Sequence, residues 1–359
     1  MDQLLHVGPA KQPDADTERK SINVLAYNFF QLPFYVPGGY KRPRVDTFFR
    51  DFADRFDVCC FTEVMYPAIN AVRPSIGRRY LLVRGYWLTL WCRSRQVWRC
   101  PVWNNAGYIA DQARGHQMPY FAVGEDIACI SLKVTDGGLM TTSKLPITDT
   151  KTVTYKASGG LPDSLVANGC LYTCIELNGL PIHIYSSHLQ SDTSLRTMGA
   201  KPGSQSGPRM LQVGEMATFM EQCQGKDHAD DAVIICGDLN IDARNPDMHA
   251  EYGDMLAKLR MTDLYHQNDL GRKFADFPIT LGDVRIAPSG EELPFETTLT
   301  QSGDYCTKQC VDYILFRQDA AGRVSASQAL VEKFEPNDKN AGFLTLSDHY
   351  GVHARISVQ

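Results

Sequence analysis

Seven polar residues recur at the ends of apolar, strand-like stretches of this 359-residue chain. The stretches INVLAY, DVCCFTE, IHIYSSH and AVIICGDLN precede or contain the first five, and LSDHYGV contains the last two. Because strand ends at one edge of a packed sheet converge, residues far apart in sequence can line one cleft. In chain order, the seven residues are Asn28, Glu63, His188, Asp238, Asn240, Asp348 and His349.

The residue types in this set predict metal-assisted chemistry at phosphorus. Carboxylate and amide oxygens are the ligands that a hard cation such as Mg²⁺ prefers. Histidines are suited to proton transfer and to stabilising a phosphorane-like transition state. A single histidine at a strand end is more often structural, and a lone GD-x-N is common by chance. The prediction therefore depends on the combination and not on any one member.

Hydrophobic periodicity predicts the elements that must position these residues. Alternating strands, hairpins and helices indicate an α/β (α+β) fold with sheet packed on sheet and helices outside. The pair Asn178-Gly179 predicts a tight hairpin. We expect a disordered lead-in at residues 1–20 and one domain over 21–359, since no linker, charge block or repeat divides the chain. The expected strands are Ser21–Tyr27, Asp57–Val64, Gly169–Leu177, Pro181–His188, Ala232–Cys236, Val311–Phe316 and Gly351–Val358. The expected helices span residues 45–56, 208–223 and 247–260.

Composition limits the class of protein. A formal net charge of −5 weighs against a dedicated DNA-binding protein, which usually carries a basic excess. No apolar run is long enough for a transmembrane helix, and the polar amino terminus lacks a signal-peptide core, so we expect a cytoplasmic or peripheral membrane protein. The 11 cysteines show no disulfide framework, which favours reduced buried thiols. Neither Cys306 and Cys310 nor Cys92 and Cys100 have a second ligand pair at zinc-finger spacing.

The motif order Asn … Glu … His … GD-x-N … D-Y-I … SDH resembles the endonuclease/exonuclease/phosphatase (deoxyribonuclease I-like) superfamily, over about residues 21 to 358. The resemblance implies a four-layer sandwich of two central mixed sheets flanked by helices. It also implies that Glu63 is the principal Mg²⁺ ligand, with Asn28 beside it and Asp348 near the metal. Mn²⁺ or Co²⁺ would substitute for Mg²⁺ at such a site.

The same resemblance assigns roles to the remaining site residues. Asp238 would orient or activate the attacking water, and Asn240 would hold a phosphate oxygen. His349 would act as general base, oriented by Asp312 of VDYILF. His188 would stabilise the transition-state oxygens or help to protonate the leaving group.

Longer stretches are most similar to the neutral sphingomyelinases. HLQSDTS followed by SGPRMLQVGEMATF, the stretch DGGLMTTSKLPI and the stretch GDLNIDARNPDMHAEYGDMLAKL each resemble a segment of that branch. The resemblance implies hydrolysis of a membrane phospholipid, with sphingomyelin cleaved to ceramide and phosphocholine, and glycerophospholipids as alternatives. One departure is Ala167-Asn168-Gly169, where relatives commonly carry a lysine before the glycine, and this leaves headgroup preference open.

Two other functions remain open at this point. One is a deoxyribonuclease, which would use the same chemistry because DNA is also a phosphodiester. The inositol-phosphatase branch fits less well, because its motif Trp-Cys-Asp-Arg is absent. A catalytically inactive scaffold would predict loss of a metal or base residue, yet all seven positions are intact.

Residues 64–110 form a basic, aromatic segment with seven arginines, all four tryptophans and no Asp or Glu. One hypothesis is a lipid-surface patch that includes Trp87, Trp91, Arg93 and Arg95, because Trp prefers the bilayer interface and Arg is attracted to lipid phosphates. A local core with solvated arginines is an equal alternative. Stacking on nucleic acid is a third alternative.

Overall fold

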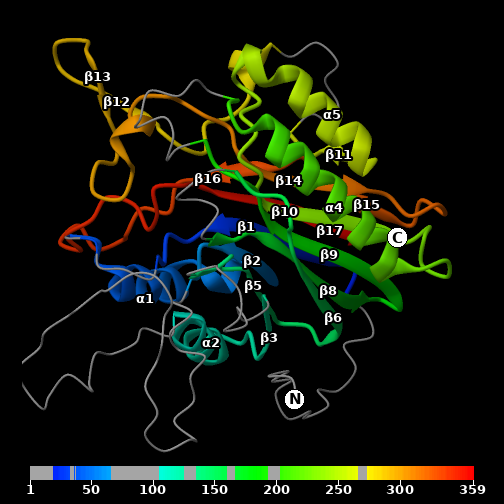
Figure 1. Ribbon diagram of the computed structural model, residues 1–359. Helices are drawn as coiled ribbons and strands as arrows, with labels where there is room; N and C mark the ends of the chain where they lie inside the picture. Colours follow the sequence, from blue (N-terminus) through cyan, green and yellow to red (C-terminus); the bar gives the residue numbers. More distant parts are fainter. Residues whose placement is uncertain are drawn as a thin grey trace, which may run out of the picture.

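The computed structural model describes residues 19–32, 36, 38–65, 105–124, 135–159, 166–192, 203–265 and 273–359. Two mixed β-sheets lie face to face, and helices cover their outer faces (Figure 1). The predicted fold class is therefore confirmed. Among the described residues, no helix is both long and apolar enough to cross a membrane.

The first sheet has the order β15-β17-β1-β2-β5-β3, with β16 also paired to β17. Within it only β1 and β2 run parallel, and β1 and β17, the first and last strands of the described residues, are antiparallel neighbours. Its strands are β1 (Ser21–Asn28), β2 (Val58–Thr62), β3 (Tyr120–Val123), β5 (Met140–Ser143), β15 (Val324–Ala326), β16 (Leu330–Glu332) and β17 (Gly351–Val358).

The second sheet has the order β11-β14-β10-β9-β8-β6, and β9 and β10 are its parallel pair. Asn178 and Gly179 join β8 to β9 with φ of 51° and 78°, as the predicted hairpin requires. Its strands are β6 (Ile147–Thr154), β8 (Gly169–Leu177), β9 (Leu180–His188), β10 (Ala232–Asp238), β11 (Thr262–Asp263) and β14 (Asp312–Arg317).

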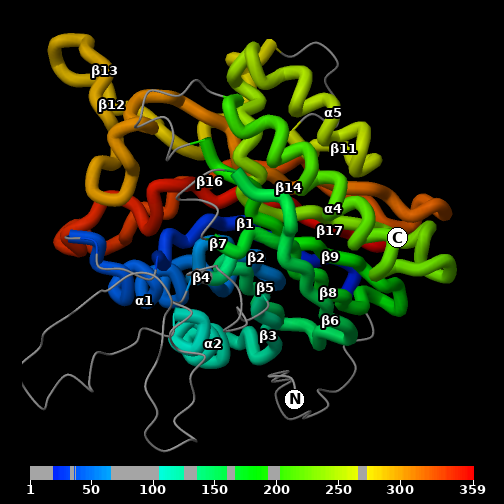
Figure 2. Tube along the Cα trace, viewed as in Figure 1, coloured from blue at the N-terminus to red at the C-terminus, as the bar shows by residue number. Residues whose placement is uncertain are grey.

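Two small ribbons complete the strands. β4 (Thr135–Asp136) pairs with β7 (Val166–Ala167), and β12 (Val284–Ile286) pairs with β13 (Glu292–Pro294). The β12–β13 hairpin projects from the body of the molecule, at the upper left of Figure 2.

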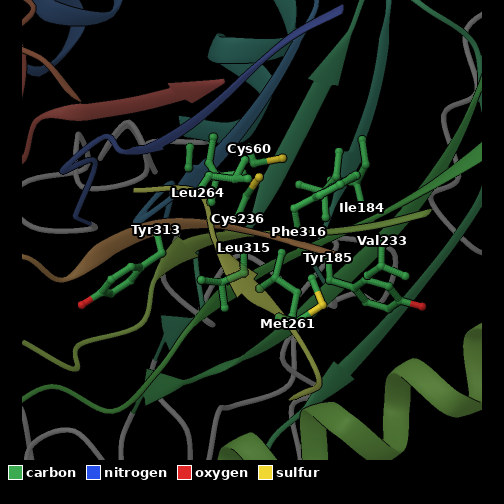
Figure 3. Packing of buried hydrophobic residues seen from close by; sticks show 14 of the residues in the cluster. Cys60, Ile184, Tyr185, Val233, Cys236, Met261, Leu264, Tyr313, Leu315 and Phe316 are labelled. Atoms are coloured by element: carbon green, nitrogen blue, oxygen red, sulfur yellow. The ribbon is translucent and has the colours of Figure 1, made fainter. Parts of the chain in front are cut away.

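Alternation along the strands decides which residues lie between the sheets. Val24 and Ala26 of β1 belong to the same buried cluster as Ile234 and Cys236 of β10. Cys236 lies beside Cys60 of β2 in this interior (Figure 3), and both thiols are free. All eight cysteines in the described part of the chain are free and six of these are buried, which agrees with the expectation of reduced thiols.

Four α-helices form the outer layers of the described structure. The side chains of α1 and α2 join a second core on the far side of β1 and β2, rich in phenylalanine. Residues of α4 and α5 bury against the second sheet. The four helices are α1 (Lys41–Asp51), α2 (Asn105–Gly115), α4 (Ser206–Gln224) and α5 (His249–Leu259).

The first helix differs from its prediction. α1 ends at Asp51, and a 3-10 turn over Ala53–Arg55 replaces the expected last turn. This change of direction lets Phe52 and Phe56 both contact Phe334, with ring centroids 5.0 and 6.1 Å away. Tertiary packing therefore ends the helix before the apolar period ends.

Candidate active site

The parallel pairs of the two sheets bring strand ends together, as the sequence pattern predicts. In the second sheet, Asp238 at the end of β10 is in register with His188 on one side and with Asp312 on the other. In the first sheet, Asn28 is the last residue of β1 and Glu63 directly follows β2. The Nδ2 of Asn28 donates to Oδ2 of Asp238 at 3.1 Å, so one site spans both sheets.

The Oδ2 atom of Asp238 lies near both histidines of the site. His188 Nε2 is 3.6 Å from it and His349 Nε2 is 3.8 Å from it. On its other side, His349 places Nδ1 2.8 Å from Oδ2 of Asp312. Because a carboxylate only accepts, Nδ1 carries the proton in this contact, and Nε2 lies on the side of Asp238.

An unusual backbone conformation holds Asn240 beside Asp238. Its φ is 51°, in the left-handed region where asparagine is among the tolerated residues. Its backbone N–H donates to Oδ1 of Asp238 at 3.1 Å, and its Nδ2 donates to the Leu189 carbonyl at 2.9 Å. The Nδ2 atom of Asn240 carries two protons, and the bond to the Leu189 carbonyl uses one of them.

Glu63 also has a left-handed backbone, with φ 58°. Gln31 N–H donates to the Glu63 carbonyl at 2.9 Å, and Val64 N–H donates to the Gly138 carbonyl at 2.9 Å. Gly138 lies so close that a Cβ there would be 2.8 Å from the Glu63 Cα. A glycine at this position therefore permits the backbone turn that aims Glu63 at the site, and the Gly-Gly pair in the stretch DGGLMTTSKLPI is the sequence signal of this contact.

Several supporting residues were not found by sequence reasoning. The Thr280 hydroxyl accepts from the backbone N–H of Val311 and Asp312, at 3.0 and 3.3 Å. The Tyr265 hydroxyl donates to the Asp312 carbonyl at 3.1 Å. Both residues come from loops that carry no motif, so only the tertiary structure reveals them.

Ser347 orders the last site segment. Its hydroxyl accepts from the His349 backbone N–H at 3.3 Å and donates to Oδ1 of Asp348 at 3.2 Å. The signal for it was present, because Ser347 precedes the Asp-His pair in the SDH motif. The motif therefore contains a turn-forming residue as well as two site residues.

Burial and like charge control the ionisation of the site. Burial, with the nearby charge of Asp312, raises the pKa of Asp238 to about 7, and burial raises the pKa of Asp348 to about 6. Burial likewise raises the pKa of Glu63. Burial alone would lower the pKa of His349, but the carboxylates of Asp312 and Asp238 raise it well above its usual value.

The donor set fits a hard divalent cation. Glu63 is partly exposed, yet its Oε2 is buried and has no hydrogen-bond partner among the described residues. Asn28 and Asp348 add an amide and a carboxylate from neighbouring segments. Crowded, buried carboxylates of raised pKa are stabilised by a cation, and oxygen ligands are the type that Mg²⁺ prefers.

The predicted membrane patch is outside the described residues. Trp87, Trp91, Arg93 and Arg95 all belong to the part of the chain for which no structure is described. The two ends of the 64–110 segment are described, and they lie in the core. Val64 is buried there, and residues 105–110 begin α2, whose buried side chains join the core beneath α1.

Sequence comparison identifies the family. The profile of the Endonuclease/Exonuclease/phosphatase family matches residues 30–349, which is most of the chain. The chain belongs to the endonuclease/exonuclease/phosphatase family. Every residue of the site described above except Asn28 lies within the matched residues.

Within the family, similarity extends to lipid-cleaving proteins. The chain is 28% identical over 221 residues to a sphingomyelinase of Dictyostelium discoideum, covering 50% of this chain and 46% of that protein. It is 33% identical over 131 residues to a phospholipase C of Staphylococcus aureus, covering 36% of each. The matches thus span less than half the length of these relatives.

A solved structure of similar fold is a β toxin variant from Staphylococcus aureus with bound magnesium ions. It superposes with a TM-score of 0.57 at 19% identity, covering 94% of this chain and 100% of the toxin. At this identity the similarity shows the fold, and it confirms the predicted four-layer architecture. The predicted roles of the site residues remain predictions.

Proposed function

We propose that this protein is a Mg²⁺-dependent phosphodiesterase that hydrolyses a membrane phospholipid, with sphingomyelin cleaved to ceramide and phosphocholine. The observation that carries the proposal is the convergence of Asn28, Glu63 and Asp348 beside the Asp238–His349–Asp312 cluster. The named relatives supply the lipid class. In this proposal the protein acts at a membrane surface, as a cytoplasmic or peripheral membrane protein.

The residues of the site suit an in-line attack of water on phosphorus. Glu63, Asn28 and Asp348 would hold the Mg²⁺ ion, which supplies polarisation of the phosphoryl oxygens and positive charge near the transition state. Asp238 orients the attacking water, and the neutral form of His349 takes a proton from it through Nε2. Asp312 holds the opposite Nδ1 proton, which fixes the ring during this transfer.

Bond breaking needs a proton at the leaving oxygen. As the new bond from water to phosphorus forms, the bond from phosphorus to the ceramide oxygen breaks, and His188 supplies a proton to that oxygen. Asn240 holds a non-bridging phosphate oxygen through its side-chain amide. The products are ceramide and phosphocholine, and no other reactant is consumed.

A substrate screen tests this proposal. Purified protein with Mg²⁺ would be assayed on sphingomyelin, phosphatidylcholine, lysophospholipid vesicles and plasmid DNA, with Glu63→Gln and chelator as controls. We expect sphingomyelin to be cleaved fastest, with phosphocholine released, and both controls to be inactive. Nicking of DNA with untouched lipids would instead establish a nuclease. Inactivity on every substrate would establish the scaffold alternative.

A further inference from the structure

A second cluster of ligand-type side chains includes His183, which lies part-way along β9, away from the active-site end of that strand. His183 is five residues before His188, so the two side chains point to opposite faces of the sheet. Their separation along the strand is roughly 17 Å at about 3.3 Å per residue. The His183 face is the one covered by α4, since the hydroxyl of nearby Tyr185 donates to the Met220 carbonyl (Figure 1).

Three ligand atoms converge on this outer face. His183 Nε2 is 3.2 Å from Oδ2 of Asp231, and His228 Nδ1 is 2.7 Å from the same oxygen. The ligand atoms of all three residues lie within 4.8 Å of one another. His228 and Asp231 both come from residues 225–231, the connection between α4 and β10. A buried residue of β9 and two residues of a surface connection therefore supply one set of ligand atoms.

The surroundings hold these side chains in place. The Tyr172 hydroxyl lies 2.9 Å from Nδ1 of His183, so the ring is fixed from behind. Gln224 Nε2 donates to the His228 carbonyl at 2.8 Å, and its Oε1 accepts from Arg317 at 2.7 Å. Metal-binding histidines usually make a hydrogen bond like the one between His183 and Tyr172, through the ring nitrogen that does not bind the metal. The side chain of His183 is only 2% exposed, whereas that of His228 is 54% exposed.

We propose that His183, His228 and Asp231 form a second metal site, which binds Zn²⁺ or a similar borderline cation and not Mg²⁺. Two imidazoles and one carboxylate suit zinc, whereas the oxygen-rich active site suits magnesium. Tetrahedral zinc with bonds of about 2.0–2.1 Å places adjacent ligand atoms roughly 3.3 Å apart. The His183 and His228 nitrogens here lie 3.2 and 2.7 Å from the Asp231 oxygen. Water from the exposed His228 side completes the set. The bound metal would fasten the α4–β10 connection to β9.

Metal titration of the full chain tests this site. With excess Mg²⁺ present to fill the oxygen-rich site, Zn²⁺ binding would be measured by calorimetry and Co²⁺ binding by visible absorption. We expect one equivalent of Zn²⁺, and an absorption band typical of tetrahedral Co²⁺. Tyr172→Phe should weaken Zn²⁺ binding roughly 10- to 100-fold, the usual effect of removing a supporting hydrogen bond.

Matched variants distinguish a metal site from a purely hydrogen-bonded cluster. His228→Ala and Asp231→Asn should lose the Zn²⁺ equivalent, and the exposure of His228 means that its loss leaves the core intact. Asp230→Asn, the same change one residue earlier, and His249→Ala, at an exposed histidine on α5, should retain it. The proposal is overturned if the wild type binds no Zn²⁺, or if all four variants bind it equally well.

Discussion

At the scale of single residues, the site depends on one buried carboxylate. Asp238 receives hydrogen bonds from the side chain of Asn28 and the backbone of Asn240, and both histidine Nε2 atoms lie near it. A buried group with so many polar neighbours cannot be replaced by an apolar residue without leaving several of them unsatisfied. The arrangement therefore explains why distant parts of the sequence must all carry polar residues.

The role of His349 gives a prediction at this scale. His349→Ala should lower kcat by at least about 10²-fold, the lower range for loss of general acid–base catalysis. Asp312→Asn should also lower kcat, because the Asp312 carboxylate holds the Nδ1 proton. Steady-state kinetics on whichever substrate the screen identifies would measure both.

His353→Ala is the matched control for this prediction. His353 lies four residues later, on β17, where it contacts Glu332 at 3.7 Å and the ring of Phe56, away from the site. Its replacement should leave kcat nearly unchanged, because His353 contacts none of the proposed catalytic residues. A His349→Ala variant with near-normal kcat would transfer the role of base to His188 or Asp238.

Sequence reasoning succeeds for residues at strand ends and fails for their supports. Asn28, Glu63 and His188 were found because each ends an apolar run, and the structure brings them together. Asp312 was found only through the family resemblance, since it begins its strand and has no distinguishing pattern. Thr280 is a loop residue that contacts the backbone of Val311 and Asp312, about 30 residues later in the sequence. No periodicity or motif indicates such a contact.

At the scale of elements, the parallel pair β9–β10 fixes the register of the site. Gly237 has φ 146°, and a Cβ there would lie 1.9 Å from the Ser187 carbonyl oxygen. That oxygen belongs to the backbone of β9, so a side chain would push the two strands apart. The displaced register would move Asp238 relative to His188, its partner across the strands.

Gly237→Ala should therefore reduce stability and activity together. We expect a loss of roughly 1–3 kcal/mol, as for overpacking of a filled interior. Gly253→Ala is the control, because Gly253 lies within α5 and nothing stands within 4 Å of its Cβ position. That helix substitution should be neutral or stabilising by up to about 1 kcal/mol. Denaturation curves and kcat of both variants would test the difference, and equal stability of the two would contradict the packing argument.

The elements predicted from sequence were those with a strong local signal. The Asn178-Gly179 hairpin, the apolar strand β10 and the long helix α4 formed close to where the pattern placed them. β6 was missed because Ile147–Thr154 is an edge strand with threonine and charged residues on its exposed positions. α2 was missed because it begins within a segment whose composition suggested a surface patch.

At the scale of the whole molecule, the site lies where two sheets and the segment before β17 meet. Its carboxylates are buried and close together, which destabilises the folded state until a cation offsets their charge. Metal binding should therefore stabilise the entire fold. At a Mg²⁺ concentration of 100 times Kd, the expected gain is about 2.7 kcal/mol.

Thermal unfolding with and without Mg²⁺ measures this gain as a rise in Tm. Glu63→Gln should abolish the rise, because it removes the principal charged ligand. Sodium chloride at the same ionic strength should produce little change in the wild type, since general screening is not binding. A Glu63→Gln protein that still gained the full stabilisation would show that Mg²⁺ binds elsewhere.

The pairing of β1 with β17 has a consequence for how the chain is made. Ser21 is opposite Ser357 in that pair, so β1 leaves the ribosome long before its neighbour is synthesised. Until then one edge of β1 has no strand to pair with, and such an edge is a target for association between nascent chains. His349 is also absent until the same moment. Synthesis therefore delays both the closure of the first sheet and the completion of the site until β17 emerges, so a stalled, incomplete chain is prone to aggregation.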